Sequence, residues 1–531
     1  MSHIRIPNGT RFNRRIALRG VMATGAAIAT GGVAHPAFAA QASEATPTAP
    51  TAPTAPAMAF PDTAIGREFA SLLDAVNSRD PERLLAHFEE YFPAEMVEGM
   101  AASTYLNTIP MGTLVVHRID EASETSLTAL VETTLSEEWL SITLASAEAG
   151  SDINVRPTQP PAGVLPDEPL DDADLADELT RYLGKLADAG VFSGAVLVAR
   201  DGKPIFEEAY GLANVERGEP NQVSTRFNLG SMNKMFTSVA IARLVESGEV
   251  AFTDPIATHL PEYPAEVADK VTIHHLLTHT SGLGDIFGPR YEAERQSLHT
   301  LADYLPLFVD EPLRFEPGAR HEYSNAGFIV LGLIIEAVTA QDYFDHVREQ
   351  VYAVAGMDAT DAFERDAPTP DLATGYTYRL PENMADLTFA DVLAGPVPND
   401  FFLSPRGTSA GGGYSTVEDL LRFDEGLRSG AFVAPAMVET LIEGKVDTPR
   451  PGTRYAYGFV DDRSGAERVV GHSGGAPGIN GNLDMYWDAD VSTVVLANLD
   501  GVAQLVSMKA RRLLFGAGAV ASEGRNLLTV R

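Results

Sequence analysis

The chain has 531 residues, of which 45% are hydrophobic, so it holds enough apolar material for a large buried core. Its 73 acidic residues outnumber 39 lysines and arginines, and at a formal net charge of −34 nucleic acids and anionic membrane surfaces are expected to be repelled. It contains no cysteine, which excludes disulfide bonds and thiol catalysis.

Residues 1–39 have the composition of an export signal. Several arginines, at Arg11, Arg14, Arg15 and Arg19, precede a mildly apolar stretch, and Ala37-Phe38-Ala39 matches an A-x-A cleavage site. Residues 13–18 are similar to a twin-arginine signal, although the first position lacks the usual Ser or Thr. We therefore expect a periplasmic or secreted protein, with the export route left open. Past this segment the sequence predicts no membrane span.

Residues 40–61 are predicted to be a linker, because their Thr-Ala-Pro repeats favour an extended chain. A folded domain is then predicted at residues 62–156. Apolar residues at Phe69, Leu72 and Val76 predict one helix, and Asp80-Pro81 begins a second. Strand patterns follow at residues 114–119, 127–132 and 139–144. This order predicts an α+β domain similar to the NTF2-like cones, which could bind a ligand, act as a scaffold or mediate dimerisation.

Prolines mark a second linker at residues 157–170, and a second domain is predicted at residues 171–520. It begins with a helix at residues 171–188. A hairpin from Gly194 to Gly211 follows, with Asp201-Gly202 as its turn. Further along, the apolar pattern predicts a helix at residues 328–338 and strands at residues 483–487 and 492–499.

A motif S-x-x-K at Ser231 and Lys234 opens another predicted helix, since Gly230 permits a tight turn and apolar residues then recur at helical spacing. Backbone N–H groups at a helix N-terminus favour an anionic alkoxide on the serine. Lys234 lies one turn along on the same side, and burial would lower its pKa toward that of a useful base. Because S-x-x-K alone arises often by chance, the prediction needs support from other residues.

Tyr323 and Asn325 provide that support. A tyrosine beside a serine and a lysine can take the serine proton as phenolate, provided that a nearby cation such as Lys234 lowers its pKa. Asn325 can direct its amide at a substrate carbonyl or at Lys234. Taken singly, Tyr323 could be a packing residue before an apolar helix and Asn325 a surface turn residue.

His472-Ser473-Gly474 follows Val469-Val470-Gly471 and predicts a short strand whose edge glycines keep clear for a substrate. The N–H of Gly475, paired with the N–H of Ser231, would form an oxyanion hole with two donors. A glycine-rich hairpin is the simpler structural explanation. The same residues match G-x-S-x-G of the α/β-hydrolases, but that fold needs a later histidine, and none follows His472.

Two histidines raise the possibility of a metal site. His275 and His279 are four residues apart on a predicted helix, as two zinc ligands would be. The zinc protease pattern also needs a glutamate after the first histidine, and residue 276 is leucine. We therefore expect no metal and no cofactor.

Two further segments complete an ordered set of motifs, Leu276-Leu277-Thr278-His279-Thr280-Ser281-Gly282-Leu283 and Ser409-Ala410-Gly411-Gly412-Gly413-Tyr414-Ser415-Thr416. With them, residues 171–520 resemble the serine β-lactamase-like superfamily, in its branch of class C β-lactamases, D-aminopeptidases and esterases. The resemblance implies an α+β fold of the β-lactamase/transpeptidase type, with an antiparallel sheet flanked by helices and an all-helical region.

The resemblance also implies roles for individual residues. Ser231 would be the acylated nucleophile, Lys234 and Tyr323 its activating pair, and Asn325 a ligand of the substrate amide. His472, Ser473 and Gly474 would form the substrate-binding strand. β-Lactamases usually have Lys-Thr-Gly there, so a histidine that is only partly charged puts strong binding of an anionic β-lactam in doubt.

We therefore expect an exported serine hydrolase that acts on small esters or on D-amino-acid amides and peptides. A β-lactamase or D,D-carboxypeptidase is one alternative, and a non-catalytic binder of cell-wall peptides, with possible cell-wall association, is another. The natural substrate, the oligomeric state and the choice of Lys234 or Tyr323 as general base stay open.

Overall fold

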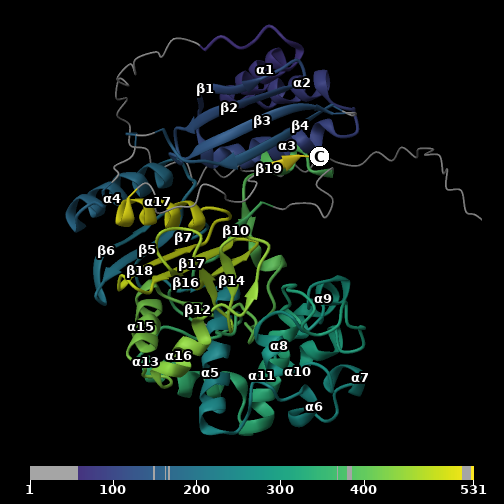
Figure 1. Cartoon of the computed structure of the whole chain (residues 1–531), viewed down its shortest axis with the longest axis vertical. Coiled ribbons are helices and arrows are strands. Elements are labelled where there is room, and N and C mark those ends of the chain that lie inside the picture. The colour runs from purple at the N-terminus through teal and green to yellow at the C-terminus, as the bar shows by residue number, and fades with distance from the viewer. Residues whose placement is uncertain are drawn as a thin grey trace, which may run out of the picture. The chain divides into compact units, whose positions relative to one another are not determined.

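The computed structural model describes residues 58–147, 150–161, 163–164, 168–367, 369–378, 386–516 and 528–530 (Figure 1). The predicted export signal and the Thr-Ala-Pro repeats lie outside the described residues. One compact unit, residues 37–531, contains all the structure described below.

Three helices open the described chain: α1 (Ala64–Ser78), α2 (Pro81–Tyr91) and α3 (Val97–Thr108). The Thr63 hydroxyl accepts a hydrogen bond from Gly66 N–H at the start of α1, and the Asp80 carboxylate accepts one from Glu82 N–H at the start of α2. The two predicted helices are confirmed. The sequence did not predict α3, because it buries small residues without a clear apolar stripe and has no capping side chain.

These helices share one hydrophobic core with a five-stranded antiparallel sheet of order β1-β2-β3-β4-β19. Its strands are β1 (Leu114–Ala122), β2 (Ser126–Thr133), β3 (Trp139–Ala147), β4 (Gly150–Pro157) and β19 (Leu528–Val530). The three predicted strands are confirmed, and the arrangement is α+β; the NTF2-like assignment stays a prediction. Two segments from much later in the chain complete this part of the fold. Strand β19 pairs with β4, and helix α14 (Phe389–Leu393) packs into the core that the sheet shares with α1–α3.

A second antiparallel sheet has eight strands in the order β13-β14-β15-β16-β17-β18-β5-β6. They are β5 (Gly194–Arg200), β6 (Lys203–Tyr210), β13 (Val446–Asp447), β14 (Thr453–Tyr455), β15 (Val460–Asp462), β16 (Val469–Ala476), β17 (Ile479–Tyr486) and β18 (Val491–Ala497). The predicted β5–β6 hairpin is confirmed. Asp201 and Gly202 in its turn both have positive φ, as a two-residue turn that follows the twist of the strands requires.

Helices cover both faces of this sheet. On one face α4 (Asp172–Asp188) and α17 (Ala503–Phe515) bury one apolar cluster. On the other, α5 (Asn233–Ser247), α11 (Asn325–Thr339), α15 (Val417–Arg428) and α16 (Pro435–Ile442) bury a larger one (Figure 1). The confirmed fold is therefore the expected antiparallel sheet flanked by helices.

Short helices form the helical region beside α11: α6 (Ile256–His259), α7 (Ala265–Ala268), α8 (Ile273–Leu277), α9 (Pro289–Glu294) and α10 (Leu301–Tyr304). After α11 come α12 (Tyr343–Val347) and α13 (Ala353–Ala355). The remaining short strands are β7 (Leu212–Asn214), β8 (Glu219–Pro220), β9 (Phe227–Asn228), β10 (Tyr376–Thr377), β11 (Val397–Pro398) and β12 (Tyr414–Ser415).

Within the described ranges, we find no single helix with the length and apolar composition needed to cross a bilayer. The bent pair formed by α11 with α12 and α13 meets the length and composition criteria together, and α11 is buried in the larger apolar cluster against the eight-stranded sheet.

Candidate active site

Ser231 lies in a single 3₁₀ turn, Gly230–Met232, that links β9 to α5. Gly230 has φ +49°, and a Cβ at this position would stand only 3.0 Å from the backbone nitrogen of Gly475 in β16. The Asn228 side chain accepts a hydrogen bond from Gly230 N–H at 2.9 Å. A glycine is therefore needed here, because it lets the serine turn lie directly against the edge of β16.

Lys234 is completely buried, and its Nζ contacts three oxygen atoms. They are Ser231 Oγ at 3.2 Å, Asn325 Oδ1 at 2.8 Å and the carbonyl oxygen of Ala410 at 2.6 Å. Burial lowers the pKa of Lys234 to about 7, against the opposing effect of the Asp285 carboxylate. A neutral amine has two N–H groups for the amide and carbonyl oxygens, which leaves its lone pair for the Ser231 hydroxyl proton.

Tyr323 lies beside the lysine, whose Nζ is 4.7 Å from the centre of the phenol ring. The residue is 37% exposed overall, yet desolvation by the surrounding protein raises the pKa of Tyr323 above its usual value. The Ser231 hydroxyl, by hydrogen bonding, opposes that rise. The phenol is therefore protonated at neutral pH, when part of the Lys234 population is neutral.

The imidazole ring of His279 packs against the phenol ring of Tyr323. Its ring lies 4.1 Å from the Tyr323 ring, and its Nδ1 accepts a hydrogen bond from Ser324 N–H at 3.1 Å. Burial first, and then the charge of Lys234, keep the pKa of His279 well below its usual value, so the ring is uncharged. Its φ of +56° is unusual for a residue with a side chain and indicates that the surrounding structure holds it there.

The predicted helix carrying both His275 and His279 was wrong in extent. Helix α8 ends at Leu277, and His279 lies beyond it in a left-handed conformation. His275 caps the same helix, since its Nδ1 accepts a hydrogen bond from Thr272 N–H. Across the part of the chain that the structure describes, no group of three His, Asp or Glu side chains is arranged to hold a metal ion.

Asn325 is held at both ends of its amide. While Oδ1 accepts from Lys234, Nδ2 donates to both carboxylate oxygens of Asp285, each at 3.0 Å. The sequence analysis did not identify Asp285. It lies two residues after the Leu276–Leu283 segment that carried part of the resemblance, but only the folded loop brings it to Asn325.

His472 and Ser473 lie in β16, paired with β17 as predicted for a strand. His472 is 6% exposed; its Nε2 accepts from the Tyr455 hydroxyl at 2.9 Å, and its Nδ1 donates to the Ser473 carbonyl at 2.6 Å. Burial, followed by the charge of Lys234, lowers the pKa of His472 to about 4. The imidazole is therefore neutral, and neither His472 nor Ser473 is among the described residues that line the cavity.

Gly474 and Gly475 have different surroundings in the same strand. A Cβ on Gly474 would lie 1.9 Å from the Leu229 carbonyl oxygen, so this glycine permits the close approach of β16 to the serine turn. Gly475 lines the cavity together with Ser231. The two backbone N–H groups predicted to form an oxyanion hole thus belong to neighbouring walls of one cavity.

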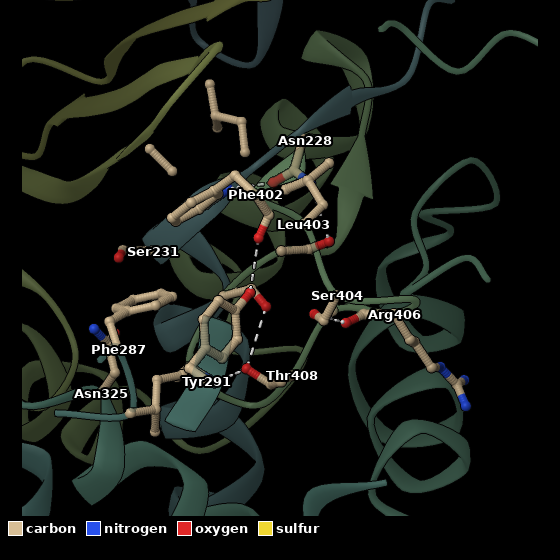
Figure 2. Close-up of a pocket in the computed structure, with 18 of the residues that line it drawn as sticks. Asn228, Ser231, Phe287, Tyr291, Asn325, Phe402, Leu403, Ser404, Arg406 and Thr408 are labelled. Carbon is tan, nitrogen blue, oxygen red and sulfur yellow. Dashed lines mark hydrogen bonds between the residues drawn. The ribbon is translucent and has the colours of Figure 1, made fainter. Parts of the chain in front are cut away.

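That cavity has a volume of about 260 Å³ (Figure 2). Ser231, Tyr323, Asn325 and Gly475 are part of its wall. Aromatic side chains supply much of the rest: Phe287, Tyr291, Tyr304, Phe363, Phe402 and Tyr414. The Phe287 and Phe402 rings stack at 5.6 Å, and the Tyr291 hydroxyl donates to the Phe402 carbonyl at 3.1 Å. The sequence did not reveal this wall, because its residues come from short helices, a strand and loops that are far apart in the chain.

Residues 175–517 match the family model described as Beta-lactamase. A penicillin-binding protein of Bacillus subtilis (strain 168) is 29% identical over 350 residues, which cover 62% of this chain and 74% of that protein. Esterase EstB of Burkholderia gladioli is 31% identical over 334 residues, covering 56% and 83%. The crystal structure of a penicillin binding protein from Bacillus halodurans superposes with a TM-score of 0.55 at 29% identity, covering 64% of this chain and 98% of that one.

Proposed function

The chain belongs to the Beta-lactamase family of serine hydrolases, and from that premise we propose that it forms an acyl-enzyme on Ser231 and releases the acyl group to water. The single observation that carries this proposal is the set of contacts at Lys234. Two of them are to the oxygen atoms of the Asn325 amide and the Ala410 carbonyl. These oxygen atoms have no proton to donate, so the amine donates both hydrogen bonds. The third places Nζ 3.2 Å from Ser231 Oγ, where the lone pair of the neutral amine would meet the hydroxyl proton.

In the proposed mechanism, Ser231 Oγ attacks the substrate carbonyl carbon while its proton passes to Lys234 Nζ. The carbonyl oxygen becomes an oxyanion that accepts hydrogen bonds from the N–H groups of Ser231 and Gly475. When the bond to the leaving group breaks, the proton passes from Lys234 to that group. Water then attacks the acyl-enzyme, gives up a proton to Lys234, and the Ser231 oxygen leaves with a proton returned.

Lys234 acts as the general base in this scheme. Burial lowers its pKa to about 7 and raises the pKa of Tyr323, so at neutral pH the amine gives up its proton more readily than the phenol. Tyr323 keeps its proton and serves as a hydrogen-bond partner of the Ser231 oxygen and of the leaving group. Its place beside Lys234 supports this role.

The proposed substrates are small esters and D-amino-acid amides or peptides whose acyl side chain is apolar and carries no carboxylate. Aromatic side chains that line the cavity favour an apolar acyl group. The neutral, buried His472 supplies no positive charge for a substrate carboxylate, and the two arginines of the cavity wall, Arg365 and Arg406, pair with Asp400 and Glu364. A β-lactamase or D,D-carboxypeptidase activity is therefore less well supported than an esterase or amidase activity.

We also propose that the protein is exported, on the strength of the arginine-rich segment and the Ala37-Phe38-Ala39 site. Esters and amides of periplasmic or extracellular origin would then be its natural substrates.

The test compares three substrates with the same purified enzyme: p-nitrophenyl acetate, D-alanine p-nitroanilide and the β-lactam nitrocefin. We expect turnover of the ester, the anilide or both, with a lower kcat/KM for nitrocefin, and loss of all turnover in Ser231→Ala. A higher kcat/KM for nitrocefin would assign the protein to the β-lactamases. Full activity in Ser231→Ala would refute the proposed nucleophile.

A further inference from the structure

Asp285 is a charged group in direct contact with Asn325, the residue that hydrogen-bonds Lys234, and the mechanism above assigns it no role. Its carboxylate receives both hydrogen bonds that the Asn325 amide nitrogen donates, and Oδ1 also accepts from the Ile286 backbone N–H at 2.7 Å. The loop backbone therefore fixes the carboxylate, and the carboxylate fixes the amide. Asp285 does not line the cavity, so it acts on the reaction through Asn325.

The orientation of the Asn325 amide decides what Lys234 can do. With the oxygen toward Lys234, as in the structure, the amide accepts an amine N–H. If the amide were turned over, its NH₂ would face the amine and compete for the lone pair that Ser231 needs. A carboxylate accepts hydrogen bonds and donates none when ionised, so only one orientation satisfies both neighbours.

We propose that Asp285 is a positioning residue that holds the Asn325 amide oxygen toward Lys234 and so keeps the lysine lone pair on the Ser231 hydroxyl. This inference rests on the proposed function, because it assumes that Lys234 is the base. Asp285 would contact neither the substrate nor the nucleophile, and would still determine how Lys234 is oriented to take the proton of Ser231.

Several charged or titratable groups surround the loop. The Asp285 charge acts on both Lys234 and Tyr323. Glu311 and Arg314 come close to the preceding residue, Gly284. His279 and His472, which respond to Lys234, are uncharged because burial lowers the pKa of each. Among these groups, Asp285 is the charge that directly favours the ammonium form of Lys234.

The first variant is Asp285→Asn, assayed for kcat/KM with p-nitrophenyl acetate from pH 5 to pH 9. An asparagine can donate as well as accept, so the Asn325 amide is free to turn, and we expect kcat/KM at the alkaline plateau to fall on the order of tenfold to a hundredfold. KM should change little. Loss of the negative charge disfavours the ammonium, so the acid limb should move to lower pH.

A role for Asp285 in loop structure alone would lower the plateau and leave the acid limb at the wild-type pH, and this result would overturn the proposal. An unchanged plateau would overturn it as well. Asp285→Glu keeps the charge, so its acid limb should stay near the wild-type position; a shift equal to that of Asp285→Asn would contradict the argument. This variant also keeps the proposal testable if Asp285→Asn does not fold.

Glu311→Gln is the matched control, because it removes a carboxylate beside the same loop that no described hydrogen bond links to Asn325 or Lys234. Its pH profile should match the wild type. Labelling of Ser231 by a fluorophosphonate probe tests the proposed nucleophile separately from the role of Asp285. If wild-type Ser231 is not labelled, the proposed function fails; if it is labelled and the Asp285 variants behave like wild type, only the role of Asp285 fails.

Discussion

At the scale of single residues, the chemistry of the site depends on the protonation states of Lys234 and His472. Burial leaves Lys234 able to lose its proton near neutral pH and keeps the imidazole of His472 neutral. The amine faces acceptors on two sides and the nucleophile on the third. A cation at residue 472 would have suited a substrate carboxylate, whereas the neutral imidazole found there offers no charge to one.

The pH dependence of acylation follows from the Lys234 amine. Because its pKa in the folded protein is about 7, well below the usual lysine value, the neutral base is scarce below pH 7 and abundant above it. We expect kcat/KM for p-nitrophenyl acetate to rise with pH through about 7 and then level off. A pH–rate profile corrected with Ser231→Ala for background hydrolysis measures this limb. A rate already at its plateau at pH 5 would contradict a lysine base.

The sequence predicted the contact of Ser231 with Lys234 because both lie on one helix, where spacing alone fixes their geometry. Asn325 could be assigned to the site because it lies two residues after Tyr323. The positions of Asp285 and His279 depend on the path of a loop after α8, including one residue at φ +56°, and no local pattern encodes such a path. The same holds for the aromatic wall of the cavity.

At the scale of elements, the close approach of β16 to the serine turn determines the site. A hairpin marked by an Asp-Gly turn, and helices marked by an apolar stripe or by Asp-Pro at the start, were predictable from the sequence, as β5, β6, α1 and α2 show. Helix α3 was not, since small buried residues leave no periodic signal. The packing of β16 against the turn depends on Gly474, whose importance becomes visible only when the Leu229 carbonyl is placed beside it.

Gly474→Ala tests this contact. Its Cβ would lie 1.9 Å from a backbone carbonyl oxygen, so β16 must shift. We expect the free energy of unfolding to fall by about 1–3 kcal/mol and kcat/KM to fall by roughly a hundredfold, as the oxyanion donors separate. Urea denaturation and the ester assay measure the two effects.

Gly184→Ala in α4 is the matched control, because no atom lies within 4 Å of the added Cβ. Helix propensity should then stabilise the protein by about 0.5–1 kcal/mol without a change in turnover. If Gly474→Ala is as stable and active as this control, the close contact is not required.

At the scale of the whole molecule, segments distant in sequence tie the two sheets together. The turn between β2 and β3 carries Glu137 and Glu138, which pair with Lys509 and Arg512 of α17. Both side chains of the Glu138–Arg512 pair are nearly inaccessible, at 4% and 8% exposure. These pairings, like that of β19 with β4, join residues several hundred positions apart, which is why the predicted domain boundaries could not include them.

Glu138→Gln leaves Arg512 buried without its carboxylate. Since breaking one side of a buried ion pair costs about 3–5 kcal/mol, we expect a loss of that order in the free energy of unfolding. Asp74→Asn, which breaks the exposed Arg83–Asp74 pair, should leave the unfolding midpoint unchanged. Equal midpoints for the two variants, compared by urea denaturation, would show that the buried pair adds nothing to stability.

Ser231 is tested as the nucleophile by the intact mass of the protein after reaction with a fluorophosphonate probe, followed by peptide mapping, with Ser231→Ala treated in parallel. We predict one adduct per chain, located on Ser231 and missing from the variant. An unmodified wild-type protein, or an adduct on another residue that persists in Ser231→Ala, would contradict an acyl-enzyme mechanism at this site.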